Sequence, residues 1–259
     1  MGTRIGVGVG ITLDLSNGVA AAFSPDDISN LSLWLDPDDA ATINKTGSTI
    51  VTITDKASSV QFGVISAPTI VTAGGVDWMN FAGTDALEVI TSGDTAGGVG
   101  AGSYTLFTVF SLSGSGTNQT LYNKGAPNLY RSRVNHSVAG NVNSTRTGPT
   151  SGLVQNSGGT GANDGLVHIH TNAFDASGLK LRNFLDGTEI NSPGSAVSTA
   201  DNINVTGSNG RINVACAWNG TSRTNFFTGK IGELLLYKKL LSAQEMAQVV
   251  TYLSDKWGA

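Results

Sequence analysis

The chain has 259 residues and a formal net charge of −4, and only 13 % of its residues are charged, about half of the roughly 25 % that is usual. Lysine and arginine total 15 and are scattered along the chain, which argues against nucleic-acid binding through a basic patch. The single cysteine, Cys216, excludes an intrachain disulfide and a multi-cysteine metal site. The chain contains no run of 18 apolar residues, so no membrane span is expected.

The first predicted element is a strand over residues 5–15, where apolar residues alternate strictly with glycine, threonine and aspartate. A bare glycine face permits close approach of another backbone, and an unpaired apolar strand is expected to add to a sheet edge. We therefore expect residues 1–22 to form a strand arm and linker that contacts its own sheet or a neighbouring chain. The expected assembly residues are Ile5, Val7, Gly8, Val9, Ile11 and Leu13. Asp14 and the glycines interrupt the apolar stretch, so no signal peptide is expected.

The main body is predicted to be one domain over residues 23–259, built from short apolar runs that Gly, Asn and Pro clusters separate. The predicted strands are Thr49–Thr54, Val76–Phe81, Tyr104–Leu112, Leu166–Phe174, Leu179–Ile190, Arg211–Trp218 and Lys230–Tyr237. Within them, Asp186-Gly187 predicts a two-residue hairpin turn. The Gly/Ser/Thr/Asn-rich segment 140–164 is predicted to be loop or irregular edge structure.

The last predicted element is an amphipathic helix. Ser242 and Glu245 match a capping box, and Gly258 ends the pattern. One helical face carries Met246, Val249, Val250, Leu253 and Trp257. A helix with one apolar stripe must pack on something, and in a strand-rich chain that is a sheet.

Six blocks of the sequence occur in the order seen in laminin-G-like domains. They read LSLWLDPDDAATI, VTITDKAS, VDWMNFAGTDALEV, YTLFTVF, LRNFLDGTEI and FFTGKIGELLLYKKLLSAQEMAQVVTYLSDKWG. From Phe23 to Ala259 the chain resembles a laminin-G-like domain of the concanavalin A-like lectin/glucanase superfamily, of the style found in tailed-phage virion surface proteins. The resemblance implies an all-β jelly-roll β-sandwich of two antiparallel sheets with a C-terminal capping helix. The last block is its most specific part, and residues 114–164 match poorly.

The sequence gives little support for catalysis. The glucanase branch of that superfamily places its paired carboxylates as Glu-x-Asp-x-x-Glu on one strand, and glycoside hydrolysis needs two carboxylates close together. None of the four glutamates, Glu88, Glu189, Glu233 and Glu245, has partners at that spacing. No Gly-x-Ser-x-Gly nucleophile motif is present either. We therefore expect a protein that is not an enzyme.

Metal binding is weakly indicated at two places. His168 and His170 share one face of a predicted strand, but a polar strand face explains them better than half of a metal site. Asp36, Asp38, Asp39 and Asp55 form the best acidic group, and their oxygens suit Ca²⁺. Turn formation and capping explain these aspartates equally well. No other cofactor is expected.

Sugar binding usually involves an exposed aromatic ring with polar neighbours. Burial is the favoured interpretation for each of the four tryptophans, because tryptophan carries much core area. The best candidate for a glycan platform is nevertheless at the end of a predicted strand, beside a polar loop. It comprises Trp218, Asn219, Arg223 and Asn225.

Two functions remain open on the sequence. The first is a non-catalytic structural protein on a virion surface, in a capsid-decoration or tail position, attached through residues 1–22 to other virion proteins or to copies of itself. The second is an extracellular lectin-like module that binds a cell-surface glycan. A homo-oligomer is expected in either case. Neither a nucleic-acid partner nor a membrane span is expected.

Overall fold

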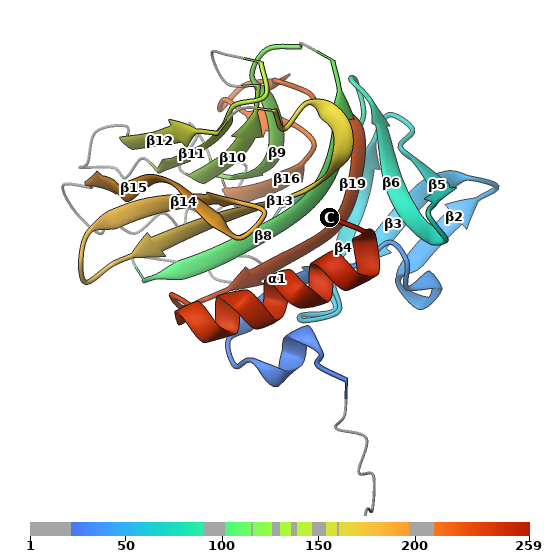
Figure 1. Ribbon diagram of the computed structural model, residues 1–259. Helices are drawn as coiled ribbons and strands as arrows, with labels where there is room; N and C mark the ends of the chain where they lie inside the picture. Colours follow the sequence, from blue (N-terminus) through green and yellow to red (C-terminus); the bar gives the residue numbers. More distant parts are fainter. Residues whose placement is uncertain are drawn as a thin grey trace, which may run out of the picture.

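The computed structural model describes residues 22–90, 102–114, 116–125, 130–135, 139–146, 154–159, 161–196 and 210–259. In this part of the chain the regular structure is β-strand, apart from two short 3-10 turns and one α-helix (Figure 1). The 3-10 turns are η1 (Pro25–Asp27) and η2 (Ala40–Thr42), and the helix is α1 (Ala243–Trp257). The predicted all-β class with a C-terminal helix is confirmed.

Strands follow one another through the whole described chain. In the first half they are β1 (Leu31–Leu35), β2 (Ile43–Thr46), β3 (Thr49–Thr54), β4 (Gln61–Ile65), β5 (Thr69–Ala73), β6 (Val76–Ala82), β7 (Ala86–Ile90), β8 (Tyr104–Ser113) and β9 (Gln119–Lys124). In the second half they are β10 (Tyr130–Val134), β11 (Val142–Arg146), β12 (Val154–Gly158), β13 (Asp164–Asp175), β14 (Lys180–Leu185), β15 (Thr188–Ala196), β16 (Arg211–Val214), β17 (Ala217–Trp218), β18 (Arg223–Thr224) and β19 (Thr228–Tyr237).

Antiparallel pairing arranges these strands in two runs. The first run is β5-β6-β19-β8-β13-β14-β15, and β1 follows β6 along the same edge of β19. The second run is β2-β3-β4-β7-β16-β9-β10-β11-β12. The pair Thr49 and Thr69 joins β3 to β5, so hydrogen bonding connects 17 strands into one nearly closed sheet. Figure 1 shows β9 to β12 lying opposite β8 and β13 to β15.

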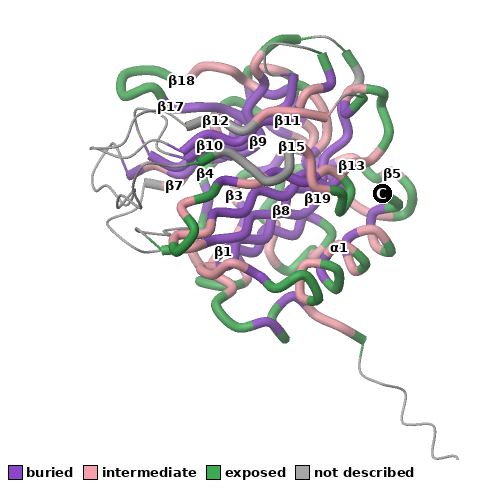
Figure 2. The backbone as a smooth tube through the Cα atoms, turned by 60° about the vertical axis from the view of Figure 1, so that its left-hand side comes forward, coloured by how far each residue is buried: buried purple, intermediate pink, exposed green. Residues whose placement is uncertain are grey.

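The main hydrophobic core lies between the two runs. Its fully buried members come from both, among them Leu106 and Phe110 of β8, Phe62 of β4 and Ile212 of β16. The alternation of core and outward residues along each strand produces this arrangement. In Figure 2 the central strand β8 is accordingly drawn as buried along most of its length. Burial at this scale is the main favourable contribution to the fold.

A second core lies on the outer side of the first run, under α1. Val249, Leu253 and Trp257 are the buried residues of the helix, as its apolar periodicity predicts. They pack with Phe107 and Leu235 and with other residues of β1, β6, β8, β13 and β19. The predicted capping box is confirmed, because Ser242 Oγ accepts from the Glu245 N–H and Glu245 accepts from the Ser242 N–H. The helix therefore covers a sheet face, as predicted.

The prediction for residues 140–164 was wrong in part. This segment contains β11 and β12, which extend the second run beyond β10. Both strands are made largely of Asn, Ser, Thr, Gln and Gly. The inward and outward positions of these strands therefore produce no alternation of apolar and polar residues in the sequence, although the β11 residues are buried.

The predicted arm lies outside the described residues, apart from Ala22 at its end. The expected assembly contacts of Ile5, Val7, Gly8, Val9, Ile11 and Leu13 thus remain predictions. In the described part of the chain, α1 lacks the length and apolar character that crossing a bilayer requires. The two-sheet jelly-roll assignment also remains a prediction, since the pairing forms a single connected network.

Candidate functional site

A groove runs between α1 and the β14–β15 hairpin, and we call it the α1 groove. Its volume is about 500 Å³. It is lined by Phe107, Thr171, Arg182, Phe184, Asp186, Gly187, Thr188, Leu241, Ala243, Met246, Ala247, Val250 and Thr251. One wall is the apolar side of the helix, and the other wall carries charged, hydroxyl and aromatic side chains. Such a mixture is typical of a site that binds a small polar ligand.

The hairpin turn places the polar wall against the helix. Asp186 and Gly187 both have positive φ, 49° and 76°, which confirms the predicted turn. A Cβ on Gly187 would lie 3.4 Å from Val250 Cγ1, so the turn touches α1. Asp186 is fixed in place, because Oδ1 accepts from the Ile169 N–H at 2.8 Å and Oδ2 lies 2.9 Å from His168 Nδ1.

Arg182 and Phe184 form the charged and aromatic part of this wall. They are two residues apart on β14 and so share a face. The Arg182 Cζ lies 5.0 Å from the Phe184 ring centroid. Arg182 donates to both carboxylate oxygens of Glu189 across the hairpin, at 2.8 and 2.5 Å. This bidentate bond holds the pKa of Glu189 below its usual value and fixes the guanidinium in one orientation.

Thr171 lies on the floor of the groove with an unused hydroxyl. The residue is 2 % exposed, and its Oγ1 has no hydrogen-bond partner. It sits on β13 between its cross-strand neighbours Phe107 and Phe184. A buried hydroxyl without a partner is unfavourable, and a ligand or an ordered water would satisfy it.

The predicted glycan platform is assembled in space but is not an open ring face. Trp218 is 8 % exposed, and the guanidinium carbons of Arg211 and Arg223 lie 4.3 and 5.7 Å from its ring. Both arginines also pair with Glu88, Arg223 at 2.9 Å. Burial of Trp218, the favoured interpretation of the sequence, is confirmed, and so is burial of Trp34, Trp78 and Trp257.

The two asparagines of that platform serve turns. Asn219 Oδ1 accepts from the backbone N–H groups of Thr221 and Ser222, at 2.9 and 2.8 Å. Asn225 has a φ of 53°, and its carbonyl accepts from the Thr120 N–H. Direct contact of these residues with a glycan remains a prediction.

The four predicted Ca²⁺ ligands do not come together as a metal-binding group, and the described residues hold no cluster of three or more such side chains. Asp36 pairs with Lys256 at 2.7 Å and Lys56 at 3.4 Å, and Asp39 pairs with Lys56 at 2.8 Å. Asp38 accepts from the Asp77 N–H, and Asp55 from the Trp34 and Ala57 N–H groups. Asp39 caps η2 and Asp55 holds a local turn, as the competing interpretation expects, whereas Asp36 forms ion pairs and Asp38 binds the backbone of β6.

His168 and His170 also have protein partners. His168 lies between Asp186 and Asp164, and its hydrogen bond to the Asp186 carboxylate raises its pKa. His170 is fully buried beside Ser132, and burial lowers its pKa to about 4. The polar strand face suggested by the sequence accounts for both.

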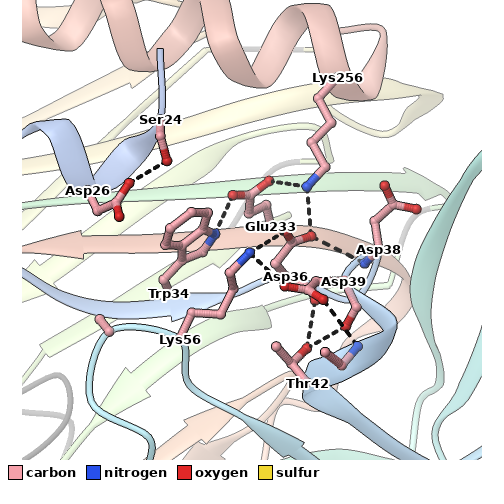
Figure 3. A network of polar contacts seen from close by, with 12 residues as sticks. Ser24, Asp26, Trp34, Asp36, Asp38, Asp39, Thr42, Lys56, Glu233 and Lys256 are labelled. Atoms are coloured by element: carbon pink, nitrogen blue, oxygen red, sulfur yellow. Dashed lines mark hydrogen bonds and ion pairs between the residues drawn. The ribbon is translucent and has the colours of Figure 1, made fainter. Parts of the chain in front are cut away.

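Asp36 belongs to a buried polar network that ties α1 to β1 and β19 (Figure 3). Glu233 is 0 % exposed and accepts from Trp34 Nε1 at 2.6 Å, Lys256 Nζ at 3.1 Å and Trp257 Nε1 at 3.1 Å. Burial raises the pKa of Glu233. Because every named partner of Glu233 is a donor that stabilises the carboxylate, this network fastens the helix to the sheet.

The sequence did not single out Thr171, Arg182 or Phe184. Each belongs to a predicted strand, but only the fold shows that their common face meets the helix. The spacing of Arg182 and Phe184 before the Asp186-Gly187 turn was the available signal, and it needed the position of α1 to become meaningful.

No family model and no curated protein sequence matches the chain. Solved structures do match. The binding domain of Paraclostridial Mosquitocidal Protein 1 superposes with a TM-score of 0.65 at 11 % identity, over 89 % of this chain and 53 % of that one. The botulinum neurotoxin serotype D ligand-binding domain, in complex with N-acetylneuraminic acid, gives 0.61 at 12 %, over 86 % and 51 %.

A Trypanosoma rangeli sialidase is also similar, with a TM-score of 0.56 at 12 % identity over 88 % of this chain and 33 % of the enzyme. The chain thus spans about half the length of the toxin domains and a third of the sialidase. At such low identity the likeness shows the fold alone, a strand-rich fold shared with toxin binding domains.

Proposed function

We propose that this chain is a non-catalytic glycan-binding module and that its α1 groove holds the saccharide. The observation that carries the proposal is the groove itself, which is lined together by Thr171 with its unpartnered hydroxyl, Phe184 and Arg182. Its volume of about 500 Å³ falls within the range of roughly 300–1,000 Å³ that small-ligand sites occupy.

The chemistry of the groove suits a sugar. A saccharide presents hydroxyl groups around its edge and C–H groups on its ring faces. Thr171 and Arg182 supply hydrogen-bonding groups, while Phe184, Met246 and Val250 supply apolar contact. Arg182 is held by Glu189 before any ligand arrives, which lowers the conformational entropy lost on binding.

The groove also suits binding without hydrolysis. Among the described residues that line it, Asp186 is the only carboxylate, and both of its oxygens already have partners. Glycoside hydrolysis needs an acid and a second carboxylate. We therefore extend the expectation of a non-enzyme to this site.

Fold neighbours support this function over the virion-surface alternative. Besides the serotype D complex, they include a botulinum neurotoxin DC binding domain in complex with SialylT and another in complex with rat synaptotagmin II. These are toxin domains that engage sugars or receptors. The proposal includes a concanavalin A-like, laminin-G-like sandwich, supported by the two facing runs of strands and the helix-covered outer face.

The test begins with a glycan array probed with the full chain, followed by titration of the best neutral glycan by calorimetry. Thr171→Val should weaken that binding about tenfold, because the substitution removes one hydrogen bond of the kind worth roughly 1.5 kcal/mol. It should not lower the melting temperature, since the hydroxyl has no partner in the free protein.

Thr108→Val is the matched control, because Thr108 is also fully buried with an unpartnered Oγ1 but does not line the groove. It should leave affinity unchanged. Equal affinity of wild type and Thr171→Val would refute the groove as the site. Loss of binding in Arg223→Gln instead would assign the glycan to the Trp218 cluster. Turnover of a bound glycan would refute the non-catalytic part.

A further inference from the structure

The outer side of the second run of strands carries polar residues at buried positions. Helix α1 packs on the first run instead. On β10, Tyr130 and Val134 belong to the main core, so alternation places Arg131 and Arg133 on the opposite, outward side. Across the neighbouring strands, Arg131 is opposite Asn123 of β9, which is opposite Asn213 of β16. We call Arg131, Arg133, Asn213 and Trp218 the arginine face.

The two β10 arginines are buried without a counter-charge. They are 5 % and 6 % exposed. Arg133 donates from Nε and Nη2 to Asn143 Oδ1 at 3.0 and 2.6 Å, which is a neutral partner. No carboxylate in the described chain forms an ion pair with either arginine, whereas Arg223 of the neighbouring hairpin pairs with Glu88 at 2.9 Å.

This arrangement is electrostatically unfavourable in the absence of an anion. Burial lowers the pKa of Arg131 to about 10, and burial together with the charge of Arg131 lowers the pKa of Arg133 to about 9. Buried charges in proteins are normally paired, because desolvation of an ion is otherwise poorly compensated. The nearest carboxylate across the described strands, Glu88 opposite Asn213, is already paired with Arg211 and Arg223.

Unsatisfied donors mark the same place. Arg131 Nε, Asn213 Nδ2 and Trp218 Nε1 are all buried and have no hydrogen-bond partner. The backbone N–H of Trp218 donates to Asn123 Oδ1 at 2.9 Å, which holds the indole next to β9. Three such donors beside two guanidinium groups favour a ligand that offers several acceptor oxygens and a negative charge.

We propose that the arginine face is an oxyanion-binding site that takes the carboxylate or sulfate of an acidic saccharide. An oxyanion supplies several acceptor oxygens and a negative charge, and guanidinium groups bind carboxylates and sulfates through paired N–H donors. The site is separate from the α1 groove, which lies on the outer side of the other run of strands. It therefore stands whether or not the groove binds a neutral glycan.

Three probes separate the sources of the anion at matched ionic strength: sodium sulfate, N-acetylneuraminate and neutral N-acetylglucosamine. Calorimetry on the full chain should show binding of the two anions. Arg131→Gln/Arg133→Gln should weaken that binding at least tenfold, because both charged donors are removed. The double variant should melt no lower than wild type in chloride, since it removes two unpaired buried charges.

Lys45→Gln/Lys180→Gln is the control, since it changes the net charge equally at two exposed lysines and should bind as wild type does. Thr171→Val should retain anion binding, so failure of the groove and failure of this site are distinguishable.

Binding of sulfate alone, lost in the double arginine variant, supports the oxyanion site but overturns the saccharide as its source. No anion binding by wild type, or equal binding by the double arginine variant, overturns the proposal. If that variant does not fold, Arg131→Lys replaces it, and unchanged sulfate affinity there overturns the proposal too.

Discussion

Replacing Lys256 by methionine tests the buried network that fastens α1 to the sheet. The Lys256 ammonium lies 2.7 Å from Asp36 Oδ1 and 3.1 Å from Glu233 Oε2, and Figure 3 shows it reaching from the helix to both. Asp36 keeps Lys56 as a second cation at 3.4 Å. For Glu233, Lys256 is the one cation among its ion pairs in the described residues.

The expected loss follows from the burial of Glu233. Its side chain is 0 % exposed, so water cannot replace the missing ammonium. Removing one partner of a buried ion pair costs about 3–5 kcal/mol. The hydrogen bonds from Trp34, Tyr252 and Trp257 remain, which favours the lower end of that range. At roughly 2–4 °C per kcal/mol for a domain of this size, the melting temperature should fall by about 6–12 °C.

The loss should depend on pH. Burial raises the folded-state pKa of Glu233 above its unfolded value. Such a group contributes stability that is present at low pH and is lost as pH rises through the folded pKa. Without Lys256 that pKa rises further, because its positive charge opposes the effect of burial. The penalty of Lys256→Met should therefore be larger near pH 8 than near pH 5, because protonation of Glu233 removes the unpaired buried charge.

Urea unfolding of both proteins at the two pH values measures this, with Lys45→Met as a control for losing an exposed lysine. Adding Glu233→Gln to Lys256→Met should recover part of the stability near pH 8, because no buried charge is then left unpaired. A loss below about 1 kcal/mol, the range of exposed pairs, would refute the reasoning. So would a loss that is the same at both pH values.

Two further predictions concern the helix and the hairpin. Leu253→Asp, which puts a charge at a 0 % exposed position of the second core, should lower the free energy of unfolding by several kcal/mol, and an unchanged chemical denaturation midpoint would mean that α1 is not docked. The hydrogen bond that His168 donates to Asp186 raises the pKa of His168, so this contact stabilises the fold below the unfolded-state pKa and is lost as pH rises through the folded-state pKa. His168→Gln should thus reduce stability near pH 5.5 more than near pH 8.5, and a histidine NMR titration giving an ordinary pKa would contradict this.

Several elements of the fold could be predicted from the sequence because the preferences of neighbouring residues agree with the tertiary packing. The capping box at Ser242 and the positive-φ turn at Asp186-Gly187 are set by residues close in sequence, and both appear as predicted. The apolar periodicity of Val249, Leu253 and Trp257 identified the buried face of α1. These features depend on few long-range contacts, which is why a single sequence could predict them.

The sites were less readable because their meaning depends on distant partners. Trp218 was correctly placed beside Arg223, but Arg211 and Glu88 turned the expected platform into a charged cluster. Arg131 and Arg133 alternate with core residues, yet nothing in the local sequence indicates that no carboxylate of the described residues pairs with them. The Asp36 group resembled a cation site until Lys56 and Lys256 were brought to it from elsewhere in the chain.

The network around Glu233 also sets a constraint on how the protein is made. Trp34 and Glu233 are 199 positions apart, and Asp36 and Lys256 are 220 apart. Among the described strands, β1 pairs with β19 alone. At about 5–20 residues per second, a ribosome needs roughly 10–40 s to synthesise the chain between such partners. For that time β1 lacks β19, the Trp34 indole lacks Glu233 and Asp36 lacks Lys256. Long-range pairing of this kind is slow and exposed to aggregation. The nascent chain is therefore a natural client for a chaperone until its last helix emerges.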